Sequence, residues 1–147
     1  MTPSEIIRQL SKLEPFDLFA RMLFGECRGE ILRGQVAVAN VAMNRLNDPR
    51  KRYGRGLTGV LLRPWAFSCF NASDPNLGLM LSLPNGLVMD RLRCLAALAE
   101  EGLVVDITQG STLYFNPSVT GGWPKRWDRN RCEIVGLIGR HVFVREL

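Results

Sequence analysis

The sequence is poor in the residues that usually build metal and redox sites. It contains a single histidine, His141, and its four cysteines, at positions 27, 69, 94 and 132, include no C-x-x-C pair. A structural zinc site needs four clustered sulfur or nitrogen ligands, so we predict no metal site and expect no cofactor. Without a secretion signal the thiols should stay reduced, and we predict no disulfide.

Long apolar segments are also missing. The longest apolar run spans only a handful of residues, and the N-terminus, Met1 to Glu5, has no basic leader followed by an apolar stretch. A membrane-spanning helix needs about 20 apolar residues, and a secretory signal needs both a basic and an apolar part. We therefore expect no stable membrane insertion and no signal peptide. The chain should be made in the cytoplasm and reach any outer substrate through a separate pore or by lysis.

The residues that are present suit one globular domain. The chain has 147 residues, of which 46% are hydrophobic, a length and a composition that fit a single core. We predict one domain over residues 1–147, acting as a monomer. The net charge of +5 favours acidic partners, such as nucleic acid or the anionic cell envelope. The densest basic cluster, residues 50–55, is interpreted as a solvated loop, because no nucleic-acid-binding motif accompanies it.

Hydrophobic periodicity predicts a mainly helical chain. Thr2 to Glu5 match a capping box with proline at the first helical position. Apolar residues recur at helical spacing in five segments, for which we predict helices: residues 3–12, 16–26, 33–46, 58–62 and 84–101. The third segment is apolar at nearly every position and should be a buried central helix, although its β-branched valines leave a strand as the alternative.

The other segments predict loops and a small β element. Residues 47–58 are polar and should form a surface loop that could border a cleft, and residues 64–83 should be irregular but packed. Short β-type segments lie at residues 106–108, 113–115 and 141–144. The predicted fold class is therefore α+β, predominantly helical.

Glu26 is the strongest candidate for chemistry. It lies at the predicted end of the second helix, after Phe24 and Gly25, and the glycine would let a polymer approach the carboxyl group closely. Burial among apolar neighbours disfavours the charged form of a carboxyl group, which suits it to donate a proton. Position alone is weak evidence, because glutamates at helix ends are more often exposed or salt-bridged. Glu30, four residues on, is expected to have a structural role and to pin the turn.

Six motifs occur in order along most of the chain. They are GECRGE at residues 25–30, GQVAVANV at 34–41 followed by Asn44-Arg45, FSC at 67–69, the set Asp106, Thr108 and Gly110, YFNP at 114–117 and IGRHVF at 138–143. In this order they resemble the cell-wall hydrolase family that includes the spore cortex-lytic enzymes. The first motif is fairly specific, and the ordered set makes coincidence improbable.

The resemblance implies a lysozyme-like fold with a small sheet. It also implies a lytic transglycosylase or muramidase that cuts the glycan strand of peptidoglycan between N-acetylmuramic acid and N-acetylglucosamine. The first glutamate of the first motif, here Glu26, would be the catalytic acid. A compact chain without a leader resembles a phage endolysin more than a spore enzyme, so we expect a role in cell lysis, with a holin for delivery to periplasmic or wall peptidoglycan.

A second carboxylate would decide between the two reactions. Ordinary hydrolysis uses two carboxyl groups at a defined separation, whereas a transglycosylase can use one group as acid and then as base. The candidates for a partner are Glu30, Asp106 and Asp128, and none stands out in the sequence. We therefore favour transglycosylation, which leaves 1,6-anhydromuramic ends, over hydrolysis.

Further motif residues are candidates for substrate binding, each with a structural alternative. Tyr114 could contact a sugar or simply pack, and Asn116 and Thr108 could orient polar groups of the glycan or form turns. Trp123, which with Trp127 flanks two basic residues, could grip the strand. One more candidate, Gln35, is a polar residue that opens the apolar helix after Glu26 and could line the cleft.

A rival hypothesis uses Cys27 as a nucleophile with His141 as its base, which would make a peptidoglycan amidase or peptidase. The neighbouring charge of Glu26 argues against it, because it disfavours the thiolate. His141 precedes an alternating segment, so we expect it to be a buried, hydrogen-bonding structural residue.

Overall fold

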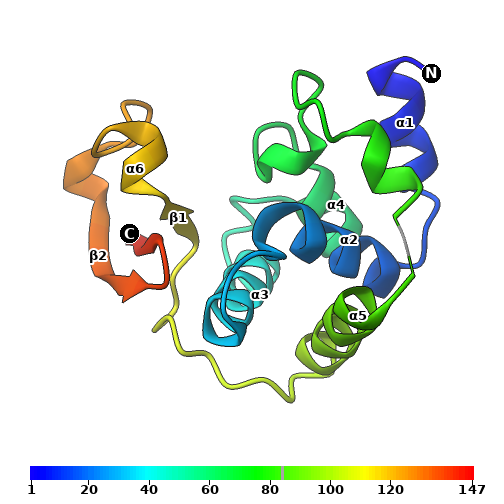
Figure 1. The fold of residues 1–147 in the computed structure, drawn as a ribbon. Helices are drawn as coiled ribbons and strands as arrows, with labels where there is room; N and C mark the ends of the chain where they lie inside the picture. The colour runs from blue at the N-terminus through cyan, green and yellow to red at the C-terminus, as the bar shows by residue number, and fades with distance from the viewer. Residues whose placement is uncertain (84) are drawn as a thin grey trace.

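The computed structural model describes residues 1–83 and 85–147 and consists of a helical body with a small sheet on one side (Figure 1). Its α-helices are α1 (Pro3–Leu10), α2 (Pro15–Cys27), α3 (Leu32–Leu46), α4 (Gly56–Leu62), α5 (Leu87–Glu100) and α6 (Pro117–Thr120). The 3₁₀ helices are η1 (Ser68–Phe70), η2 (Gly78–Leu81) and η3 (Arg129–Arg131), and the strands are β1 (Leu113–Phe115), β2 (Cys132–Ile138) and β3 (His141–Glu146). The predicted class, α+β and mainly helical, is confirmed.

The predicted helices are found with small changes at their ends. The capping box of α1 is confirmed, because the Thr2 hydroxyl accepts from the Glu5 amide and the Glu5 carboxylate accepts from the Thr2 amide. The predicted start of the last long helix, Pro84, lies outside the described residues, and α5 begins at Leu87. Among the described helices none is both long and apolar enough to cross a bilayer.

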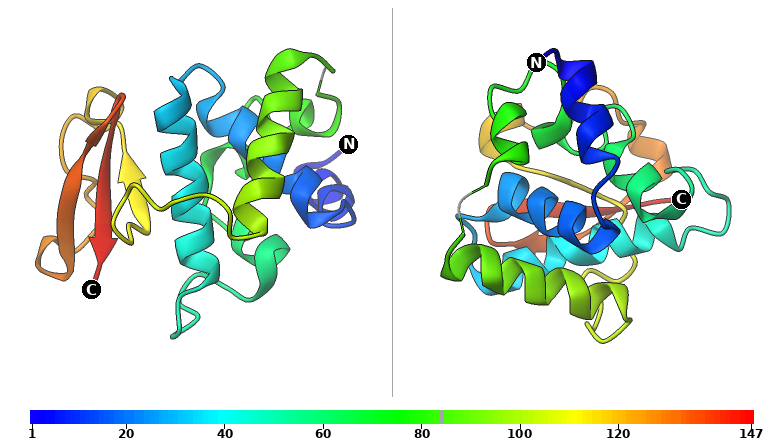
Figure 2. Two further views of the ribbon diagram at one scale, coloured as in Figure 1. Left: turned by 90° about the horizontal axis from the view of Figure 1, so that it is seen from below. Right: turned by 90° about the vertical axis from the view of Figure 1, so that its right-hand side faces the viewer.

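Helix α3 lies at the centre of the molecule, as predicted. Figure 2 shows it between the sheet on one side and α5 on the other. Its small and branched apolar residues, such as Ala37, Val38 and Val41, are fully buried. Because a helix with alanines on its surface lets its neighbours approach closely, α3 can pack against both the helical body and the strands.

The sheet is antiparallel with the order β1, β3, β2. The central strand β3 places Phe143 opposite Tyr114 of β1, and a tight turn joins Ile138 to His141. Strand β2 was not predicted, and it contains an irregularity between Ile134 and Gly136. The predicted β segment at residues 106–108 is wrong, because these residues form a turn held by side chains.

That turn fixes the path of the chain from α5 to the sheet. The carboxylate of Asp106 accepts hydrogen bonds from Thr108, from the Gly110 amide at 2.8 Å and from Asn44 of α3 at 3.1 Å. Burial alone would raise the pKa of Asp106, but these hydrogen bonds outweigh it and hold the pKa below its ordinary value. Asp106 therefore has a structural role, because its carboxylate oxygens are occupied by the hydrogen bonds of this turn.

Candidate active site

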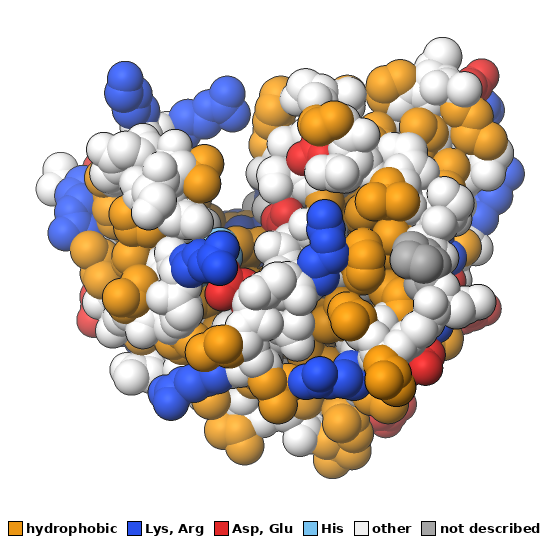
Figure 3. Space-filling model, in the orientation of Figure 1, with side chains coloured by type: hydrophobic (Ala, Val, Ile, Leu, Met, Phe, Trp, Pro, Cys, Tyr) orange, Lys and Arg blue, Asp and Glu red, His pale blue; other side chains and the backbone are white. Residues whose placement is uncertain are grey.

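A cleft of about 450 Å³ separates the helical body from the sheet, and the space-filling view shows the molecule hollowed at this place (Figure 3). One wall comes from α2, α3 and the segment around η1, and the other from β1, α6, the following loop and the start of β3. The lining residues are Glu26, Arg45, Trp65, Ala66, Ser68, Leu113, Tyr114, Phe115, Asn116, Val119, Thr120, Pro124, Trp127 and His141.

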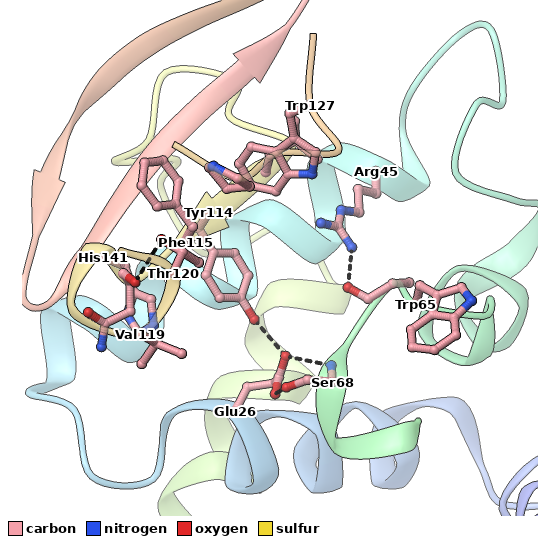
Figure 4. Close-up of a pocket in the computed structure, with 14 residues that line it drawn as sticks. Glu26, Arg45, Trp65, Ser68, Tyr114, Phe115, Val119, Thr120, Trp127 and His141 are labelled. Atoms are coloured by element: carbon pink, nitrogen blue, oxygen red, sulfur yellow. Dashed lines mark hydrogen bonds between the residues drawn. The ribbon is translucent and has the colours of Figure 1, made fainter. Parts of the chain in front are cut away.

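Glu26 occupies the last turn of α2 and points its carboxylate into this cleft (Figure 4). The hydroxyl of Tyr114, on the opposite wall, donates to Oε1 at 2.9 Å. Ser68 donates twice, from its amide to Oε1 at 3.2 Å and from its hydroxyl to Oε2 at 2.9 Å. Three donors from two separate segments therefore fix the orientation of one carboxylate.

The two carboxylate oxygens of Glu26 are not equivalent. Oε1 accepts from the Ser68 amide, which can only donate, and from Tyr114. Among the described residues, Oε2 accepts only from the Ser68 hydroxyl, which can rotate and become an acceptor. A proton on the carboxyl group is therefore best placed on Oε2, where Ser68 can adapt to either protonation state.

Gly25 brings the Ser68 segment close to Glu26. A Cβ atom at Gly25 would lie 2.5 Å from Cβ and 2.9 Å from Sγ of Cys69. Only glycine allows η1 to pack this tightly on α2. The sequence suggested that Gly25 leaves room for a polymer. The structure gives a different reason for the glycine, which is the close packing of η1 on α2 behind the carboxylate.

Arg45 forms hydrogen bonds to both walls at the base of the cleft. Its buried guanidinium donates to the carbonyl of Thr112, before β1, at 2.6 Å and to that of Ala66, before η1, at 3.0 Å. It also stacks on the ring of Phe67, 4.7 Å from the centroid. These contacts position both segments that carry the donors to Glu26.

Tyr114, on β1, is held between Glu26 and the side chains of the central strand β3. Its ring meets that of His141 edge to face, with the centroids 5.2 Å apart, and lies beside Phe143. Burial, together with the nearby charge of Glu26, raises the pKa of Tyr114 well above its ordinary value. The phenol therefore stays protonated at neutral pH and serves as a donor.

Glu30 lies next to the catalytic candidate but has different contacts. Its Oε1 is 3.3 Å from Nδ1 of His141, and a Cβ at Gly139 would lie 2.9 Å from its Oε2. Gly139, with φ of 60°, forms the β2–β3 turn, so Glu30 packs this turn against the end of α2. Burial lowers the pKa of His141 although the Glu30 charge opposes the change, so the imidazole is neutral near pH 7. His141 is only partly buried and also lines the cleft, so the structural roles expected for Glu30 and His141 stay predictions.

The structure brings some of the proposed binding residues to the cleft and not others. Asn116 lines it beside Tyr114 and also caps α6 by accepting from the Ser118 amide at 3.0 Å. Thr108 is fully buried in the Asp106 turn, away from the lining residues. Gln35 is also buried, and its amide donates to the carbonyl of Cys27 at 3.3 Å, so it caps the end of α2.

The two tryptophans of the loop after α6 have separate positions. Trp123 packs edge to face on Phe115 and Trp127, and its indole N–H donates to the Trp127 carbonyl at 3.0 Å. Trp127 itself lines the cleft. Trp123 thus supports the wall on which Trp127 is displayed.

Sequence reasoning did not assign roles to three cleft residues. Ser68 lies within the FSC motif, which was the only signal for it, and Arg45 lies in the motif Asn44-Arg45. Trp65 stands out only in the structure, where it is 67% exposed. Their contacts join segments far apart in the chain, and local patterns do not report such contacts.

The rival nucleophile, Cys27, is unsuited to attack. It is 2% exposed, and its thiol contacts the Leu23 carbonyl of its own helix. Burial, with the charges of Glu26 and Glu30 adding to it, raises the pKa of the Cys27 thiol far above its ordinary value. His141 contacts Glu30 and Tyr114.

The helical body, the small sheet and the carboxylate between them define a class of protein. The family model described as Cell Wall Hydrolase matches residues 29–144, and the chain belongs to this family. Glu26 lies just before the matched range, so its assignment rests on the motif and on the geometry of the cleft.

Two curated relatives with the same name resemble the chain. It is 37% identical over 127 residues to a spore cortex-lytic enzyme of Halalkalibacterium halodurans, covering 86% of this chain and 33% of that protein. The spore cortex-lytic enzyme of Bacillus subtilis is 32% identical over 126 residues, covering 86% of this chain and 36% of that protein. The chain thus spans less than half the length of these curated relatives.

Solved structures show the same fold. The catalytic domain of the germination-specific lytic transglycosylase SleB from Bacillus anthracis matches with a TM-score of 0.67 and 27% identity, over 89% of this chain and 93% of that one. The catalytic domain of SleB from Bacillus cereus matches with a TM-score of 0.66, over 89% of each chain.

Proposed function

We propose that this chain cuts the glycan strand of peptidoglycan at the bond between N-acetylmuramic acid and N-acetylglucosamine, as a lytic transglycosylase. The observation that carries the proposal is that a single carboxyl side chain lines the cleft among the described residues. Among its described lining residues, Glu26 is the only aspartate or glutamate. The names of the relatives, spore cortex-lytic enzyme and lytic transglycosylase, agree with this activity.

The candidate partner carboxylates all have other contacts. Glu30 packs on the β2–β3 turn and His141, and Asp106 is saturated by hydrogen bonds. Asp128 caps η3 by accepting from the Asn130 amide at 3.0 Å. Two-carboxylate hydrolysis requires a second group about 5–9.5 Å from the first, across the scissile bond. No other described residue that lines the cleft supplies one, and Glu30, which lines an adjoining hollow with Glu26, is held by His141 and the β2–β3 turn. This favours a mechanism in which Glu26 acts twice.

In the first step Glu26 is the acid. Protonated on Oε2, it donates its proton to the glycosidic oxygen as the bond to C1 of the muramic residue breaks. Ser68 and Tyr114 hold the carboxyl group during this transfer, and the three hydrogen bonds stabilise the carboxylate that forms.

In the second step Glu26 is the base. The carboxylate removes the proton from the 6-hydroxyl of the same muramic residue, and the freed oxygen bonds to C1. The product is a 1,6-anhydro ring, and the proton returns to Oε2, so the enzyme is restored. A water molecule in place of the 6-hydroxyl would make the chain a hydrolytic muramidase, which is the alternative.

The biological setting is a separate part of the proposal. The relatives' names favour lysis of the spore cortex. An endolysin role, with synthesis in the cytoplasm and a holin for delivery to wall peptidoglycan, stays a prediction from the sequence. Digestion of cortex and of vegetative peptidoglycan side by side would separate the settings, because an endolysin should cut the vegetative wall at least as fast.

Two substitutions test the chemistry. Glu26→Gln keeps an acceptor for Tyr114 and Ser68 but has no transferable proton, so we expect lysis of purified peptidoglycan to fall by about 10²–10⁴-fold. Cys27→Ser should keep nearly full activity. The reverse pattern would support the amidase hypothesis and exclude the glycosidase. Retained activity in both variants would exclude both.

A further inference from the structure

Trp65 has a backbone conformation that tryptophan rarely adopts. Its φ is 66°, in the left-handed region, where a side chain with a Cβ is disfavoured. The amide of Ala66 donates to the carbonyl of Arg63 at 3.0 Å, which closes a four-residue turn with Pro64 and Trp65 in the middle. Proline followed by a residue of positive φ fits a type II turn, whose third position prefers glycine.

Burial of the Trp65 side chain does little to offset this backbone strain. Trp65 is 67% exposed, whereas large aromatic residues normally contribute to stability by being buried. A strained residue that buries so little of its side chain destabilises the fold, and strain of this kind is characteristic of functional positions. Folding alone therefore does not account for a tryptophan at this position.

The indole lies in the cleft, on the same wall as Ser68 (Figure 4). Three residues of extended chain span at most about 10 Å, so Trp65 is close to the segment that holds the Glu26 carboxylate. A glycan strand bound at Glu26 and running along this wall passes the indole within one or two sugar units.

Arg126 of the opposite wall contacts the same ring. Its guanidinium carbon lies 5.1 Å from the ring centroid of Trp65, a cation–π contact between the loop after α6 and the helical body. Because most of Trp65 stays exposed, the guanidinium covers only part of the ring. The contact favours one orientation of the indole before any ligand binds.

We propose that Trp65 is a sugar-binding platform, on which the apolar face of a pyranose ring of the glycan stacks beside the reacting residue. The inference rests on the proposed function and adds a residue that determines substrate affinity. The strain at φ of 66° is then a stability cost of having an aromatic ring at this position, because glycine, which suits the turn better, has no ring to offer. Arg126 orders the platform from the other wall.

The test uses Trp65→Gly in a Glu26→Gln background, so that glycan binds without being cut. The probe is a peptide-free oligosaccharide of alternating N-acetylglucosamine and N-acetylmuramic acid, and its affinity is measured by titration calorimetry. The Tm of each variant is measured by thermal unfolding. Lys51→Gly is the matched control, because Lys51 also has a positive φ, 55°, but lies outside the cleft lining. Trp65→Asn is a second variant, since asparagine tolerates this conformation.

We expect Trp65→Gly and Trp65→Asn to bind the oligosaccharide at least tenfold more weakly, with a Tm equal to or above that of the parent. Lys51→Gly should bind like the parent. If the Trp65 variants bind as well as the parent, the platform is excluded while the proposed function stands. A fall in Tm together with affinity would make Trp65 a structural residue and overturn the inference. A Glu26→Gln parent that binds no glycan would overturn both proposals.

Discussion

The hydroxyl of Tyr114 donates a hydrogen bond of 2.9 Å to Oε1 of Glu26, across the cleft and across 88 positions of sequence. This contact joins the sheet to the catalytic helix at the reacting group. Removal of the Tyr114 hydroxyl should therefore reduce catalysis and leave the fold intact.

Tyr114→Phe should lower kcat by about 10–100-fold with little change in KM. A hydrogen bond to a charged group contributes about 1.5–3 kcal/mol, and each 1.4 kcal/mol is a factor of ten in rate. The ring keeps its contacts with His141 and Phe143, so the melting temperature should change little. Steady-state kinetics and thermal melting check this. A large rise in KM with normal kcat would show that Tyr114 binds substrate instead of orienting Glu26.

Gly25→Ala should destabilise the fold by about 1–3 kcal/mol, the usual cost of overpacking. The new methyl group would overlap Cβ of Cys69, at 2.5 Å, and push the Ser68 segment away from Glu26. Activity should therefore fall further than stability alone explains. Gly29→Ala is the control, because nothing lies within 4 Å of its added Cβ. Denaturant unfolding that gives equal stabilities for the two variants would contradict the packing argument.

Glu30→Gln should keep activity within about tenfold of the parent. Removal of a second catalytic carboxylate would cost about 10²–10⁴-fold, whereas the account gives Glu30 only packing contacts with His141 and the Gly139 turn. Asp128→Asn is a parallel case, since asparagine caps helices as well as aspartate. Assays of peptidoglycan lysis by the two variants test this prediction. A loss of three orders of magnitude in either variant would restore a two-carboxylate mechanism.

His141 should make the fold less stable in acid. Its pKa is lowered by burial in the folded state, so the unfolded chain takes up the proton more readily. Its contribution is complete above the unfolded pKa of about 6.5, and stability is lost as the pH falls below that value. His141→Gln should show a smaller drop in Tm between pH 7.5 and pH 5 than the parent. An identical drop would mean that His141 does not titrate in this range.

The sequence predicted the helical body because its signals are local. The capping box at Thr2 and Glu5 and the apolar pattern of α3 depend on neighbours a few residues away, and both were found in the structure. Strand β2 escaped prediction because it is largely exposed and interrupted near Gly136, so it shows no clear alternation.

The site was predictable only in part for a similar reason. Glu26 could be found from its motif, but Ser68 contacts it from 42 residues away, a distance that no periodicity reports. Gln35 shows the opposite failure. A polar residue at the head of an apolar helix suggested a cleft, whereas its amide satisfies the Cys27 carbonyl inside the protein.

The central claim is that Glu26 alone serves as acid and base in a transglycosylation, with the muramic 6-hydroxyl as the attacking group. Mass spectrometry of purified peptidoglycan digested by the wild-type protein tests it most directly, with Glu26→Gln as the blank. The account predicts fragments that end in 1,6-anhydromuramic acid and are absent from the blank. Fragments with reducing muramic ends from the wild-type protein would contradict it, because they form only when a water molecule, and not the muramic 6-hydroxyl, attacks C1.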